Sequence, residues 1–131
     1  MTLGVADVDR ARTFYESLGW SGESPDGDIY LFQMNGMVLG LWNRQKLADD
    51  CCVQDSGGWG GVQLTHNVGS REEVDAIMGE AEAAGATIGR PAEVQPWGGY
   101  TGVFHDLDGH AWEIAHIPWW ILTEDGGIRL H

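Results

Sequence analysis

Two stretches built on the same plan decide the fold. Residues 35–42 read Asn-Gly-Met-Val-Leu-Gly-Leu-Trp, and residues 108–115 read Asp-Gly-His-Ala-Trp-Glu-Ile-Ala. Each begins with a turn-forming pair ending in Gly, and each follows another strand-like run, Ile29–Met34 or Tyr100–His105. Asn-Gly between two apolar runs is a strong hairpin signal. The two stretches therefore predict the second strands of two hairpins, and their alignment indicates an internal repeat.

A strand and a helix precede each hairpin. Residues 2–6 predict the first strand, and Asp7 then caps a helix whose apolar residues recur at helical spacing. Residues 61–68 predict the equivalent second strand, followed by the capping box Ser70-x-x-Glu73 and a second amphipathic helix. Each helix pattern ends at a glycine that leads into a short strand. The repeat is thus a β-α-β-β-β module.

The modules span residues 1–55 and 60–131, joined by a Gly-rich segment. Neither module buries both faces of its sheet alone, so we expect a single domain over residues 1–131. With 131 residues, of which 43% are hydrophobic and 20 are Gly, the chain is long enough for one core and rich in turns. The expected fold class is α+β, with both modules forming one open, mixed β-barrel that encloses a cleft.

The charge balance excludes several partners. Seven basic and twenty acidic residues give a net charge of −13, which repels nucleic acids and anionic lipid surfaces. The apolar runs are far shorter than a membrane span, and the amino terminus lacks the pattern of a signal peptide. We therefore expect a cytoplasmic protein with no membrane or nucleic-acid partner. Cys51 and Cys52 are adjacent, as expected of loop thiols rather than a disulfide or a zinc site.

The doubled module, the opening run Leu3–Tyr15 and the late run Asp106–Glu113 resemble the vicinal oxygen chelate superfamily. This superfamily includes glyoxalase I, extradiol dioxygenases, fosfomycin-resistance enzymes and bleomycin-resistance proteins. The resemblance covers nearly the whole chain. It implies the fold more strongly than a function, because one architecture here serves lyases, dioxygenases, transferases and metal-free binding proteins.

The resemblance also implies a place for a metal ion. Metal-dependent relatives hold a divalent ion between the modules, with ligands on the first and last strands of each. The last of these positions falls on Glu113, and the one on the strand that opens the second module falls on Gln63. The repeat partner of Glu113 is Gly40, and the twin of Gln63 falls just before Met1. At most two of four donors remain, so no cofactor is firmly expected, and a divalent ion held by Gln63 and Glu113 is the one candidate.

Each of these residues has two interpretations. Glu113 is either a functional acid, acting as ligand or base, or an inherited residue paired with a polar neighbour. Gln63 is either a metal or ligand contact or an ordinary polar residue lining the cavity. Strand alternation places Glu113 on one face with Ala111 and Ala115, opposite Trp112 and Ile114.

The histidines do not complete a metal site by their sequence positions. His66 and His116 fall on apolar strand faces, which predicts histidines packed in the core or at its edge rather than metal ligands. His105 and His110 flank the hairpin loop, and we expect both to be solvated. His131 ends the sequence and carries no prediction.

Aromatic residues offer another kind of site. The sequence contains seven Trp, and the segment Trp97-Gly98-Gly99-Tyr100 leads into the hairpin that carries Glu113. Paired glycines allow a ligand to approach the backbone, and Trp97 and Tyr100 can stack on a planar or cationic guest. The alternative is that these rings cover the end of an open barrel. Trp119 and Trp120 are expected to cover the sheet or a subunit contact.

Two functions follow from this sequence. The favoured one is a bleomycin-resistance-type protein with a degenerate metal site, which binds a small, cationic or aromatic molecule in the cleft between the modules without chemistry. The alternative is a divalent-metal-dependent lyase or dioxygenase acting on a substrate with adjacent oxygens. The resemblance, together with unpaired sheet edges, also predicts a homodimer.

Overall fold

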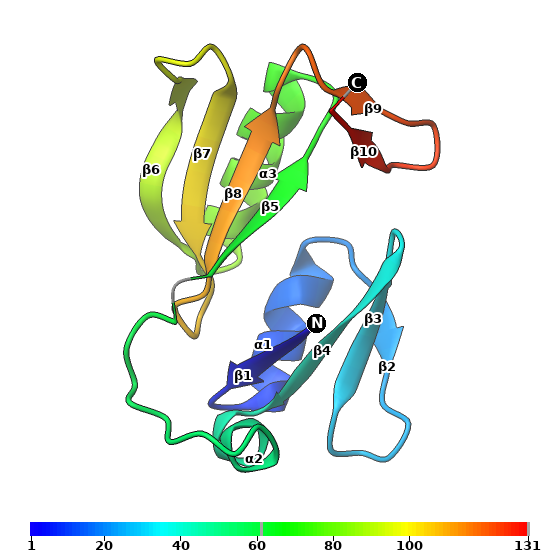
Figure 1. Cartoon of the computed structure of the whole chain (residues 1–131), viewed down its shortest axis with the longest axis vertical. Coiled ribbons are helices and arrows are strands. Elements are labelled where there is room, and N and C mark those ends of the chain that lie inside the picture. Colours follow the sequence, from blue (N-terminus) through cyan, green and yellow to red (C-terminus); the bar gives the residue numbers. More distant parts are fainter. Residues whose placement is uncertain (61, 131) are drawn as a thin grey trace. The chain divides into compact units, whose positions relative to one another are not determined.

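The computed structural model describes residues 1–60 and 62–130, which divide into two units, residues 1–60 and 61–131. Figure 1 shows both units, the first combining a mixed sheet with the helices α1 and α2 and the second a mixed sheet with the helix α3. Gly61 and His131 lie outside the described residues, and the predicted strand start at Gly61 falls there. None of the helices in the described part of the chain has the length and apolar character needed to cross a bilayer.

The first unit follows the predicted order of elements. Its elements are β1 (Thr2–Val5), α1 (Val8–Ser17), β2 (Gly22–Glu23), β3 (Tyr30–Met34), β4 (Met37–Asn43) and α2 (Arg44–Asp50). The sheet order is β1-β4-β3-β2, with β1 parallel to β4 and the remaining neighbours antiparallel. Asp7 caps α1, as predicted, by accepting the backbone N–H of Arg10 at 3.0 Å.

The second unit repeats this plan and extends it. Its elements are β5 (Gln63–Asn67), α3 (Arg71–Ala83), β6 (Thr87–Val94), β7 (Tyr100–His105), β8 (Ala111–His116), β9 (Ile121–Leu122) and β10 (Ile128–Arg129). The main sheet has the order β5-β8-β7-β6, again with one parallel pair, β5 and β8. The shared strand order confirms the repeat of β-α-β-β-β elements and the α+β class.

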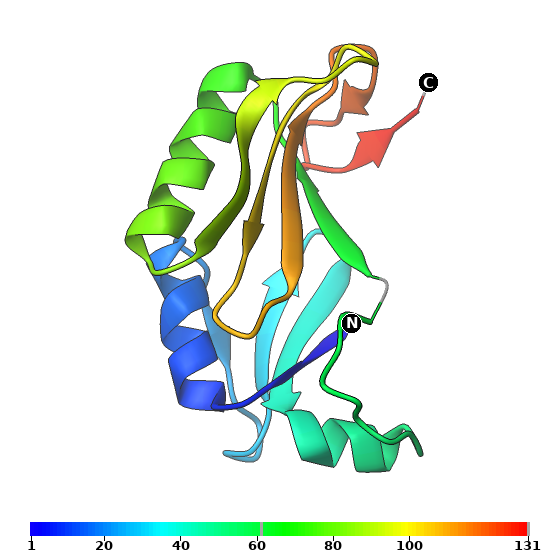
Figure 2. The same cartoon turned by 90° about the vertical axis from the view of Figure 1, so that its left-hand side faces the viewer.

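Helix packing divides the second sheet into an apolar and a polar face. The helix α3 packs on β6, β7 and β8, as the side view in Figure 2 shows. Its buried residues Val74 and Met78 lie on the same side of the sheet as Phe104, Trp112 and Ile114, which are all buried. Gly102 also faces the helix, since a Cβ there would meet the Met78 side chain at 2.9 Å. Residues that alternate with these on β7 and β8 point to the opposite face.

Two parts of the fold were not predicted from the sequence. The short helix α2 begins after Asn43, whose side chain caps it by accepting the backbone N–H groups of Gln45 and Lys46. The hairpin of β9 and β10 turns through residues 123–127. Cys51 and Cys52 follow α2 as exposed free thiols, in agreement with the expectation of loop cysteines.

Candidate ligand-binding face of the second sheet

Glu113 lies on the face of the second sheet that α3 does not cover. It pairs with Val103 on β7 and with Thr65 on β5, while its neighbours Trp112 and Ile114 are buried on the helix side. The Glu113 side chain is 19% exposed. Strand alternation therefore predicted its direction correctly, with the small residues Ala111 and Ala115 on the same face.

Cross-strand pairs define the other residues of this face, because paired residues project to the same side. It is strongly polar. We call it the Glu113 face, and it consists of Gln63, Thr65, Asn67, Thr87, Arg90, Glu93, Thr101, Val103, His105, Ala111, Glu113 and Ala115.

Gln63 lies on the same face as Glu113, but it is not directly opposite Glu113 on the neighbouring strand. It pairs directly with Ala111, so it lies diagonally from Glu113 on the adjacent strand. Diagonal Cα atoms in a sheet are roughly 7–8 Å apart, a distance that long side chains span. The Gln63 residue is exposed at the edge of the sheet. The structure thus brings the two candidate donors to one face.

Arg90 is the functional candidate that the sequence did not reveal. Its Nη2 donates to Thr101 Oγ1 at 2.5 Å and lies 3.6 Å from Glu113 Oε2. Its Nε lies 4.0 Å from Glu93 Oε1. The strand β6 has register shifts on both sides of Arg90, and such irregularities redirect side chains. A cation is therefore held directly beside the predicted acid.

Two buried polar atoms on this face lack a hydrogen-bond partner among the described residues. They are Asn67 Oδ1 and Arg90 Nε. Native structures contain few such atoms, since each one costs free energy. A bound ligand or ordered water that reorganises these side chains would satisfy them.

The donors of this unit do not fit a divalent ion as they stand. Within the described residues, no three His, Cys, Asp or Glu side chains lie together in a way that would hold a metal. Catalytic zinc sites, by comparison, use three protein ligands. Glu113 has the Arg90 guanidinium beside it, and a metal ion at the same place would meet the repulsion of this positive charge. Gln63 and Glu113 alone therefore do not make a metal centre.

The first unit has no acid at the equivalent position. Gly40 pairs with Thr2 on β1, as Glu113 pairs with Thr65 on β5. A Cβ at Gly40 would meet side-chain atoms of Thr2, Leu31 and Ile29 at 3.2–3.4 Å. The register supports the sequence alignment of the two repeats, and these three side chains leave little space for a side chain at Gly40.

Trp97 and Tyr100 lie in different surroundings. Trp97 is 51% exposed in the β6–β7 turn, and its ring contacts that of Trp119 edge to face, with 6.0 Å between centroids. Tyr100 lies on the helix side of β7, where its hydroxyl donates to Asp75 Oδ1 at 2.7 Å and Arg71 covers its ring. This hydrogen bond, aided by desolvation, raises the pKa of the Tyr100 hydroxyl. Tyr100 and Glu113 therefore occupy opposite faces.

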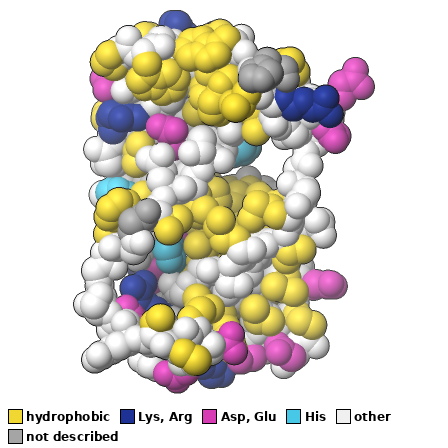
Figure 3. Space-filling view, viewed as in Figure 1, with side chains coloured by type: hydrophobic (Ala, Val, Ile, Leu, Met, Phe, Trp, Pro, Cys, Tyr) yellow, Lys and Arg dark blue, Asp and Glu magenta, His cyan; other side chains and the backbone are white. Residues whose placement is uncertain are grey.

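Hydrophobic side chains gather at the upper end of the second unit in Figure 3. The exposed residues Val94, Trp97 and Trp119 flank the start of β7 and the end of β8. Val103 pairs with Glu113 and lies three residues from Tyr100 along β7. The end of the sheet at Tyr100 therefore lies roughly 10 Å from Glu113. Trp97, with its neighbour Trp119, therefore remains available to a ligand that extends along the sheet.

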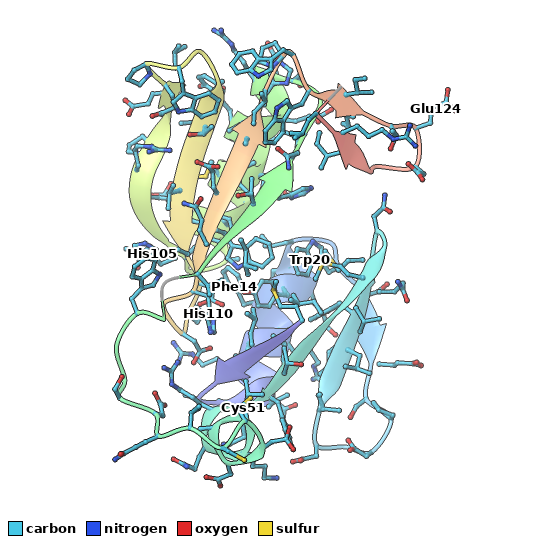
Figure 4. The ribbon with its side chains drawn as sticks, in the orientation of Figure 1. Phe14, Trp20, Cys51, His105, His110 and Glu124 are labelled. Atoms are coloured by element: carbon cyan, nitrogen blue, oxygen red, sulfur yellow. The ribbon has the colours of Figure 1, made fainter. Side chains whose placement is uncertain are left out.

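The histidines differ from expectation in two places. His110 was expected to be solvated, but its side chain is only 19% exposed and its Nδ1 lies 2.7 Å from Oδ2 of the buried Asp106. Figure 4 shows His110 at the β7–β8 turn, which this pair closes. His66 was expected under a helix, but it is exposed, because β5 is an edge strand and α3 packs on the other three. His116 Nδ1 lies 3.2 Å from the Val68 carbonyl, consistent with a histidine at the edge of the core.

The sequence-family model of the Glyoxalase/Bleomycin resistance protein/Dioxygenase superfamily matches residues 1–114 of this chain. The chain therefore belongs to this superfamily, as the resemblance of its repeats and of the Asp106–Glu113 run implied. No curated protein sequence matches the chain significantly.

Solved structures agree with this assignment. A glyoxalase-related enzyme from Fulvimarina pelagi is 39% identical, with a TM-score of 0.91 over 98% of this chain and 94% of that one. A superfamily enzyme from Burkholderia phytofirmans is 19% identical, with a TM-score of 0.77 over 89% and 95%. A lactoylglutathione lyase from Agrobacterium tumefaciens is 21% identical, with a TM-score of 0.67 over 88% and 90%. The latter two support the fold alone.

Proposed function

We propose that this protein binds a small molecule on the Glu113 face and holds it without a metal ion. The observation that carries the proposal is the placement of Glu113, which lies between two alanines with Arg90 beside it rather than further metal donors. Glu113 stays partly exposed between these small residues, and the charged pair supplies an acceptor and a donor in adjacent positions. Such an arrangement binds and orients a ligand.

The net charge of the protein and the exposed ring of Trp97 indicate the class of ligand. The net charge of −13 favours a cationic guest over an anionic one. Trp97 presents an exposed indole at the end of the sheet, and indole faces bind planar and cationic groups. A ligand that extends from Glu113 to Trp97 therefore combines a cationic or hydrogen-bond-donating group with an aromatic ring.

We expect a cationic planar dye, acriflavine, to bind more tightly than the anionic dye fluorescein in isothermal titration calorimetry. Binding of acriflavine should weaken as salt screens the charge. Trp97→Ala should cost about 1–3 kcal/mol of binding free energy, as truncation of anchoring aromatic residues does. Gly99→Ala should also weaken binding, because the new Cβ would lie 2.2 Å from the Trp97 ring and displace it.

Tyr100→Phe is the matched control, since it keeps the ring and removes only the hydroxyl that donates to Asp75 on the helix side. It should leave dye binding unchanged. Equal affinity of the wild-type protein and the Trp97→Ala variant would assign Trp97 a structural role. Tighter binding of fluorescein than of acriflavine would contradict the proposed ligand class.

We also propose a homodimer. The β9–β10 hairpin exposes the apolar side chains of Ile121, Leu122 and Ile128, and a second copy of the chain can cover them. Sedimentation velocity at micromolar concentration should therefore give about twice the chain mass of 14.3 kDa. Replacing Ile121 and Ile128 with Ser should shift the protein toward the monomer. A monomer at all concentrations would rule out the covering role.

A further inference from the structure

The Arg90 guanidinium occupies a position surrounded by oxygen groups from three strands. Thr101 Oγ1 lies 2.5 Å from Nη2, Glu113 Oε2 lies 3.6 Å from Nη2, and Glu93 Oε1 lies 4.0 Å from Nε. Thr101 is fully buried, and the hydrogen bond that it accepts fixes the end of the Arg90 side chain. These oxygen groups therefore already bind one positive charge, which is the guanidinium of Arg90 itself.

Carboxylate and hydroxyl oxygens are also the donors that hard divalent cations prefer. Two carboxylates and one hydroxyl lie around the guanidinium, and they would attract such an ion if the guanidinium were absent. With Arg90 in place, an incoming divalent ion meets its positive charge at short range and must also take its position. The same contacts that stabilise Arg90 thus exclude the metal.

We propose that Arg90 is the residue that makes the Glu113 face metal-free, because it supplies at Glu113 the positive charge that a divalent ion would otherwise bring. The inference rests on the proposed metal-free binding function and deepens it. Because of Arg90, a ligand contacts the Arg90–Glu113 pair directly and does not chelate a metal ion.

The test compares Mn²⁺ binding by the wild-type protein and by Arg90→Ala, measured from the free Mn²⁺ signal in electron paramagnetic resonance. Protein without a histidine tag should carry substoichiometric metal after purification, by elemental analysis. Arg90→Ala should bind one Mn²⁺ per chain at least tenfold more tightly than the wild type. The double variant Arg90→Ala, Glu113→Gln should lose this gain.

Arg90→Lys is the matched control, because it keeps the positive charge and should bind Mn²⁺ as weakly as the wild type. Arg90→Gln provides a second neutral variant if Arg90→Ala unfolds, and it should also gain affinity. Circular dichroism and the melting temperature establish that each variant is folded before it is titrated.

Two results would overturn the inference. If neutral Arg90 variants bind Mn²⁺ no more tightly than the wild type, Arg90 does not exclude the ion, although dye binding without metal can still stand. If the wild type holds one Mn²⁺ tightly and loses it on Glu113→Gln, both the inference and the metal-free function fail. A gain on Arg90→Ala together with no dye binding would support the inference and leave the proposed function without support.

Discussion

Phe104→Ala is expected to lower the free energy of unfolding by about 3–5 kcal/mol, the usual cost of removing a large buried aromatic side chain. Phe104 is 1% exposed and stacks on Trp112, with 6.3 Å between ring centroids. The matched variant is Phe32→Ala, because Phe32 pairs with Leu39 in the first unit as Phe104 pairs with Trp112 in the second. Phe32 is also fully buried.

This pair of variants tests whether residues 1–131 form one domain. If the two units unfold together, chemical denaturation should show a single transition in each variant, shifted by similar amounts. Tryptophan fluorescence and circular dichroism should then give coincident curves. A transition that splits in Phe104→Ala, with one half unchanged from the wild type, would show that the units unfold separately.

Asp106→Ala is expected to cost about 2–4 kcal/mol of stability, because it leaves several hydrogen-bond donors of the β7–β8 turn without a charged acceptor. Asp106 Oδ1 accepts the backbone N–H groups of Asp108 at 2.9 Å and His110 at 2.8 Å. Its Oδ2 lies 2.7 Å from His110 Nδ1, and the residue is buried. The stability difference can be measured by urea denaturation.

The control for this variant is Glu124→Ala, an exposed acid in the β9–β10 turn that extends away from the ribbon in Figure 4. Its effect should stay within about 0.5 kcal/mol, as for most surface substitutions. The stability loss of Asp106→Asn should lie between those of Asp106→Ala and Glu124→Ala, since the amide keeps one acceptor oxygen. A loss in Asp106→Ala no larger than that in Glu124→Ala would mean that the turn closes without the carboxylate.

The order of elements along the chain and the two long helices could be predicted because their signals are local and occur twice. Turn glycines, capping residues and apolar spacing each involve neighbours within a few residues. The short elements α2 and β9–β10 gave weaker signals. The helix α2 covers only Arg44–Asp50, and β9 and β10 have two residues each, too few for a periodic pattern to emerge.

The candidate site was predictable only where strands are regular. Alternation on β8 gave the direction of Glu113 correctly, and the parallel pairing of β5 with β8 brought Gln63 to the same face. Arg90 could not be assigned to this face because register shifts in β6 interrupt the two-residue period. Tyr100 follows Trp97 closely in sequence, but alternation on β7 turns it toward α3.

The pairing of His110 with Asp106 was missed for a different reason. A residue next to a hairpin loop is exposed in most cases, and the sequence contains no sign that Asp106 turns inward. The structure shows that the acid binds backbone N–H groups of its own turn and thereby reaches the partly buried histidine. This closure joins residues only two to four positions apart, but neither the helix period nor the strand period indicates it.

The irregular strand β6 also limits how two copies of this chain can join. It is an edge strand of the second sheet, and Pro91 within it has no backbone N–H to offer a further strand. Its register shifts interrupt the regular row of backbone groups that strand addition requires, a common protection against aggregation. If copies associate by extending this sheet, the new strand must therefore add at β5, and β6 is left to shape the binding face.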